Sequence, residues 1–113
     1  MDDAYEQLKP DILQIINEPE NLIYVSLATL WELGIKISIG KLKLPKGFFE
    51  NLPELGYEIL TITLPHIKTY INLPLYHRDP FDRILIAQAI SERLTLVTRD
   101  PSIVQYDVDT LKA

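Results

Sequence analysis

Residues 77–83 read His-Arg-Asp-Pro-Phe-Asp-Arg, and this stretch contributes most to the prediction of the fold. An Asp followed by Pro is typical of a helix start, because Asp79 suits the N-cap and Pro80 suits the first helical position. Asp82 then falls in the first turn of that helix. An acidic side chain is therefore predicted at a helix N-terminus.

Residues 94–100 read Leu-Thr-Leu-Val-Thr-Arg-Asp, in which positions 94–98 have the character of a short buried strand. Asp100 follows just beyond the carboxyl end of that strand. In open α/β sheets, ligands bind outside the carboxyl ends of the strands and beside the N-termini of the following helices. We therefore expect Asp82 and Asp100, which come from distant elements, to meet at this edge.

Segments of strand and helix character alternate along the rest of the chain. Thr29 and Glu32 have the spacing of a capping box, and Gly40 is placed to end the helix that they open. The other expected elements are strands at residues 22–26, 57–62 and 106–108, helices from about residue 10, at 48–55 and at 65–73, and one helical turn at 101–104. This alternation predicts a single α/β domain over residues 1–113, with a mainly parallel sheet.

Composition bounds the class of protein. The chain of 113 residues is 47% apolar and 24% charged, which is typical of a soluble globular protein. Apolar runs fall short of the roughly 20 residues that span a bilayer, and the acidic start of the chain is unlike a signal peptide, so we expect a cytoplasmic protein without a membrane role. The absence of Cys excludes thiolate metal sites. A net charge of −5 argues against a broad basic surface for nucleic acid, but metal-binding acids in a nuclease would themselves contribute negative charge.

The candidate metal ligands are four acids: Glu32, Asp79, Asp82 and Asp100. Carboxylate oxygens completed by water are the ligands that Mg²⁺ or Mn²⁺ prefers, and such a site can activate water to hydrolyse a phosphodiester. Each acid also has a structural alternative. Glu32 suits a capping box or an ion pair with Lys36, Asp82 favours the helix dipole, and Asp100 can cap a short turn. For Asp79 the cap is the favoured interpretation.

Histidines and basic residues surround these acids in the sequence. His66 and His77 are candidate ligands or bases, but their polar, loop-like surroundings favour surface positions without a catalytic role. Basic side chains are expected to be mostly solvated. Some flank the acids and are candidates for contacts with phosphate groups of a substrate: Lys36, Arg83 and Arg99.

Four stretches together resemble the PIN domain family, and within it the VapC-like toxins of bacterial type II toxin–antitoxin systems. They are Val-Ser-Leu-Ala-Thr-Leu-Trp-Glu-Leu-Gly-Ile-Lys at 25–36, Gly-Lys-Leu at 40–42, the run from His77 to Ala89, and Leu-Val-Thr-Arg-Asp at 96–100. The match runs in consistent order from about residue 6 to the C-terminus. The run at 77–83 is specific for this branch of the family.

The resemblance implies a three-layer α/β/α fold and a ribonuclease site of four acids that binds Mg²⁺ or Mn²⁺. Carried over by position, Glu32, Asp82 and Asp100 are three of these acids, with Asp79 beside them as cap or supporting ligand. The family's first acid ends an N-terminal strand in a motif like Leu-Leu-Asp-Thr-His, which has no counterpart here. We therefore expect the N-terminal strand to be missing.

The leading functional hypothesis is a toxin-type endoribonuclease in which Glu32, Asp82 and Asp100 hold the metal that activates water against RNA. The missing first acid favours an alternative for the chain alone, a non-catalytic PIN remnant that binds protein partners. A PIN-like nuclease outside a toxin system is a third hypothesis. Family toxins usually form dimers and are inhibited by a cognate antitoxin, so the resemblance implies a homodimer and an antitoxin partner.

Overall fold

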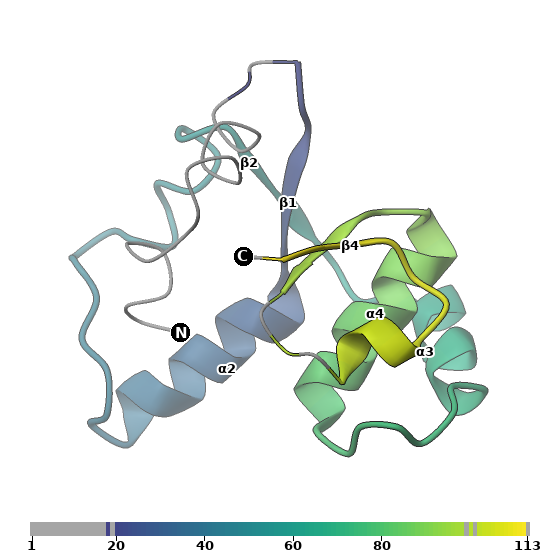
Figure 1. The fold of residues 1–113 in the computed structure, drawn as a ribbon. Helices are drawn as coiled ribbons and strands as arrows, with labels where there is room; N and C mark the ends of the chain where they lie inside the picture. Colours follow the sequence, from purple (N-terminus) through teal and green to yellow (C-terminus); the bar gives the residue numbers. More distant parts are fainter. Residues whose placement is uncertain (1–17, 19, 99, 101, 113) are drawn as a thin grey trace. The chain divides into compact units, whose positions relative to one another are not determined.

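The computed structural model describes residues 18, 20–98, 100 and 102–112 (Figure 1). The chain divides into two compact units, Met1–Thr61 and Ile62–Ala113, and each is described by itself. The helix expected from about residue 10, and the region where a missing N-terminal strand would join the chain, lie outside the described residues. The single domain over residues 1–113 stays a prediction.

The first unit begins, in its described part, with a strand that runs directly into a helix. Strand β1 covers Ile23–Ser26 and helix α2 covers Leu27–Ser38. Ser26 is buried and serves as the N-cap of α2, because its backbone is extended and its Oγ accepts a hydrogen bond from the Ala28 N–H at 3.0 Å. The strand prediction is confirmed. The capping box expected at Thr29 is wrong, since the N-cap lies three residues earlier, at Ser26.

A second strand completes the parallel pair of this unit. Strand β2, Tyr57–Leu60, pairs with β1 in a register that places Ile23 opposite Tyr57 and Ser26 opposite Leu60. The helix expected at 48–55 is wrong, because this segment forms successive turns. Pro53 explains the difference, since it removes one backbone N–H from the middle of the expected helix.

The second unit contains two helices that lie side by side and a second parallel strand pair (Figure 1). Its elements are helix α3, Leu64–Ile71, helix α4, Pro80–Glu92, strand β3, Leu96–Thr98, the short 3₁₀ helix η1, Ile103–Gln105, and strand β4, Thr110–Lys112. The parallel pairs and their helices confirm the predicted α/β class. The terminal strand expected at 106–108 is wrong, because the strand that pairs with β3 begins at Thr110.

Tyr106 explains that shift. Its ring is buried with Ile86 and Ile103 in the core of the second unit, against which Leu73, Ile90, Leu96 and Val108 also pack. The Tyr106 hydroxyl accepts hydrogen bonds from the backbone N–H groups of Tyr76 and His77 at 3.1 and 2.9 Å. Its backbone N–H donates to the Ile103 carbonyl and its carbonyl accepts from the Val108 N–H, so these backbone groups form turns and not a strand ladder.

Both ends of α4 have defined caps. The Asp79 Oδ1 accepts a hydrogen bond from the Phe81 N–H at 2.9 Å, and Pro80 occupies the first helical position, so the predicted helix start is confirmed. At the other end Arg93 adopts the left-handed conformation, with φ 57° and ψ 46°. A non-glycine residue is strained there because its Cβ crowds the backbone.

His66 is buried, and the surface position expected for it is wrong. Its Nδ1 accepts a hydrogen bond from the Thr63 N–H at 3.1 Å, which caps the start of α3. The proton is therefore assigned to Nε2, which lies 2.7 Å from Oε2 of Glu92 at the end of α4. This histidine joins the two helices through a partner 26 residues away, a contact that the sequence around it does not indicate.

Relief of the strain at Arg93 is testable. We expect Arg93→Gly to raise the free energy of unfolding by roughly 0.5–1 kcal/mol, because glycine adopts the left-handed conformation without a steric penalty. The matched control is Lys68→Gly, an exposed position within α3, which we expect to lower it by about 1 kcal/mol. Urea denaturation of both variants measures the difference. If both variants changed the free energy of unfolding in the same direction, the result would contradict backbone strain at Arg93.

Candidate metal centre

Two acids converge in the second unit, where the start of α4 and the end of β3 present them. Asp82 is the third residue of α4, so its carboxylate lies in the first turn. Asp100 follows β3 and begins the turn that leads to η1. Both elements pack against each other, which brings the helix start and the strand end to one place.

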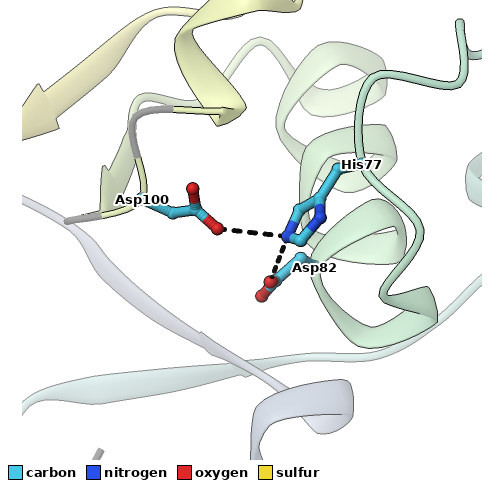
Figure 2. Close-up of side chains that lie close together, drawn as sticks. All are labelled: His77, Asp82 and Asp100. Atoms are coloured by element: carbon cyan, nitrogen blue, oxygen red, sulfur yellow. Dashed lines mark hydrogen bonds and ion pairs between the residues drawn. The ribbon is translucent and has the colours of Figure 1, made fainter.

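His77, from the loop before α4, lies between the two carboxylates (Figure 2). Its Nε2 is 2.7 Å from the Asp82 Oδ2 and 3.1 Å from the Asp100 Oδ2. One ligand atom from each of these three residues, hereafter the His77–Asp82–Asp100 cluster, lies within 4.8 Å of the other two. The side chains are 21%, 30% and 37% exposed, respectively, so the cluster is open to solvent and to a substrate.

Asp100 is held in place through its other carboxylate oxygen. Oδ1 accepts hydrogen bonds from the Ser102 hydroxyl at 2.7 Å and from the Ser102 N–H at 2.9 Å, while the Asp100 N–H donates to the Thr98 Oγ1. These bonds point Oδ2 toward His77. The Ser102 hydroxyl, then its N–H, hold the pKa of Asp100 below its ordinary value against the opposing effect of partial burial, and nearby His77 lowers it further.

The backbone of His77 is anchored on both sides. Its N–H donates to the Tyr106 hydroxyl, and its carbonyl accepts a hydrogen bond from the Arg83 Nη1 at 3.4 Å. Arg83 also donates to the Pro74 carbonyl at 2.9 Å and to the Tyr106 hydroxyl at 3.3 Å. The loop that carries His77 is thus bound to α4 next to Asp82, which fixes the imidazole relative to the acid.

The sequence model of the PIN domain family matches residues 6–109 of the chain. The chain belongs to the PIN domain family. Searches of curated proteins and of solved structures gave no match. PIN domains are generally metal-dependent nucleases that act on RNA, and they typically bind divalent metals.

Among the described residues, the helices are all too short or too polar to cross a bilayer.

The donor atoms of this PIN domain fit a divalent cation. Adjacent ligands of an octahedral Mg²⁺ at about 2.1 Å lie about 3 Å apart, and the two distances from the His77 Nε2 are close to this separation. Carboxylate oxygens suit Mg²⁺ and Mn²⁺, while an imidazole nitrogen suits later transition metals better. The Asp82 and Asp100 ligand oxygens lie within 4.8 Å of each other, so the two carboxylates repel each other and a cation between them is favourable.

The remaining acids and bases of the predicted site are Asp79, Glu32, Lys36 and Arg99. Asp79 uses Oδ1 to cap α4 and is not part of the His77–Asp82–Asp100 cluster, so the favoured structural interpretation is confirmed, while a role as supporting ligand stays a prediction. Glu32 and Lys36 lie on α2 in the first unit, and their participation also stays a prediction. Arg99 lies outside the described residues.

Arg83 is not the solvated side chain that the sequence indicated. Arg83 is 7% exposed, and its guanidinium lies over the Tyr70 ring at 4.8 Å in addition to its hydrogen bonds. It is bound inside the second unit, so its geometry favours holding the loop over contacting a phosphate. His77 belongs to the His77–Asp82–Asp100 cluster. The sequence signal for this position is that His77 lies five residues before Asp82, in the loop that precedes the N-cap residue Asp79.

The pKa of Asp100 gives a test of the turn that positions it. We expect Ser102→Ala to raise this pKa toward its ordinary value, as measured by the pH titration of the Asp100 carboxyl ¹³C resonance. Because the pKa of Asp100 is lowered in the folded protein, the stabilisation is complete above the unfolded-state pKa and is lost as pH falls through the folded-state pKa.

Ser102→Ala should therefore lower the free energy of unfolding at neutral pH by roughly 0.5 kcal/mol, the value for a partly exposed hydrogen bond, and should lower it less in acid. Ser102→Thr is the matched control because it keeps the hydroxyl. An unchanged Asp100 titration in Ser102→Ala would show that the hydroxyl does not hold the carboxylate.

Proposed function

We propose that this PIN domain is an endoribonuclease of the VapC toxin type that depends on Mg²⁺ or Mn²⁺. The observation that carries the proposal is the convergence of the Asp82 and Asp100 carboxylates on the His77 Nε2. The toxin type is supported by the similarity of residues 25–36, 77–89 and 96–100 to that branch of the family. A cytoplasmic location, a homodimer and a cognate antitoxin belong to the same proposal.

Each residue of the site has a defined task in this proposal. Asp82 and Asp100 hold the cation, with Glu32 as the third acid and Asp79 as a supporting group. A bound Mg²⁺ or Mn²⁺ supplies an activated water and polarises the phosphodiester. Ser102 orients the Asp100 carboxylate, and the bonds of Arg83 and Tyr106 hold the loop of His77 against α4.

Contacts with the substrate involve the basic side chains. Lys36 and Arg99 contact phosphate groups in this proposal, which positions RNA without reading its sequence. Arg83 contributes through the loop that it holds, because its donors are directed to carbonyls and to the Tyr106 hydroxyl. The negative net charge of −5 makes the cation itself important for RNA to approach the acids.

The non-catalytic remnant is a weaker candidate. Its argument rests on the absent first acid, and no feature of the described residues favours it. The convergence of the Asp82 and Asp100 carboxylates on the His77 Nε2 is an arrangement that a remnant would not need. Retention of that arrangement supports a site in use.

The function is tested by incubating the full chain with total cellular RNA and Mn²⁺, with and without a chelator. We expect endonucleolytic cleavage that the chelator abolishes and that Asp82→Asn or Asp100→Asn lowers by at least about 100-fold, because removal of a ligand weakens the metal and misplaces the water. Asp107→Asn, an exposed site with the same change of charge, is the control and should cleave like the unaltered chain.

Cleavage that persists in the chelator or in both variants would contradict the proposal. Absence of cleavage by a folded chain that binds Mn²⁺ would favour the non-catalytic remnant. Co-purification with the product of a neighbouring antitoxin gene tests the toxin type separately.

A further inference from the structure

We propose that His77 supplies a nitrogen ligand to the cation that Asp82 and Asp100 hold, so that the centre has a mixed nitrogen and oxygen donor set. The inference rests on the metal dependence proposed above and adds a residue beyond the acids to the site. It begins from one observation: the His77 Nε2 lies 2.7 Å from the Asp82 Oδ2 and 3.1 Å from the Asp100 Oδ2 (Figure 2).

Each of the two carboxylates directs one oxygen toward the imidazole of His77. Asp100 directs Oδ1 to Ser102 and Oδ2 to the imidazole, so one oxygen anchors the turn and the other is presented to the cluster. Asp82 likewise presents Oδ2, at 2.7 Å from the Nε2. One donor atom from each of the three residues lies within 4.8 Å of the other two, a spacing that the ligands of a single cation have.

The imidazole is oriented before any cation arrives. The His77 N–H and carbonyl are held by Tyr106 and Arg83, two buried residues of the second unit, and Arg83 directly follows Asp82 in α4. The side chain keeps 21% of its surface exposed, so water can accept a hydrogen bond from the Nδ1–H of a neutral imidazole whose Nε2 coordinates the cation. A ligand positioned in advance loses little side-chain freedom on binding.

A nitrogen donor has a measurable consequence for metal choice. Imidazole binds Mn²⁺ and later transition metals better than Mg²⁺, which prefers oxygen ligands and retains its waters. We therefore expect this PIN domain to bind Mn²⁺ more tightly than Mg²⁺, and the preference to depend on His77. His77→Gln keeps a polar side chain of similar reach but removes the imidazole.

Electron spin echo spectroscopy of Mn²⁺ on the full chain tests the proposal directly, because it detects coupling to a coordinated ¹⁴N nucleus. We expect imidazole modulation in the unaltered chain, its conversion to the ¹⁵N pattern when histidine is ¹⁵N-labelled, and its loss in His77→Gln. The chain contains two histidines, and His66 is buried in its contact with Glu92. Calorimetry should show Mn²⁺ affinity falling about 10-fold in His77→Gln, with a smaller change for Mg²⁺.

The outcomes separate this inference from the proposed function. Mn²⁺ that binds through Asp82 and Asp100 without imidazole modulation would overturn the ligand role of His77 and leave metal-dependent cleavage intact; the imidazole would then only donate a hydrogen bond. Modulation that persists in His77→Gln would overturn it as well. A folded chain that does not bind Mn²⁺ would overturn both, and circular dichroism of each variant confirms that folding is preserved.

Discussion

A buried guanidinium must find acceptors, and the acceptors of Arg83 determine the arrangement of the second unit. Burial of a charge without partners is costly, so the hydrogen bonds of Arg83 to Pro74, His77 and Tyr106 are a requirement of the fold. They join α4 to the loop before it and to the segment after η1. The loop that presents His77 is thus fixed by the residue next to Asp82.

The position of the site depends on the hydrogen bonds of Arg83 and on two caps, one at the start of α4 and one in the turn after β3. Asp79 fixes where α4 begins, which places Asp82 three residues further on, and Ser102 fixes the carboxylate of Asp100 after β3. These are short-range interactions between neighbours in the sequence. The long-range contacts of Tyr106 and Arg83 then hold the loop that places His77 between the two acids. The resulting cluster offers donor atoms that suit a divalent cation.

The parts of the structure that depend on local chemistry were predictable from the sequence. The Asp79–Pro80 start of α4, strand β1 and the meeting of Asp82 with Asp100 were all predicted, because caps, β-rich runs and strand ends have local signatures. The buried positions of His66 and Arg83 were not predicted, since each depends on a partner more than 20 residues away, Glu92 and Tyr106 respectively. Two other differences have local signals in the sequence: Pro53 removes a backbone donor from the helix expected at 48–55, and Ser26 offers an N-cap ahead of Thr29.

The central claim is that Asp82 and Asp100 form a divalent cation site at the junction of α4 and β3. Anomalous diffraction from crystals of the full chain grown with Mn²⁺ tests it most directly. The account predicts an anomalous peak within coordination distance of one oxygen from each carboxylate. Ordered Asp82 and Asp100 side chains with no peak between them, or Mn²⁺ bound only at other residues, would contradict it.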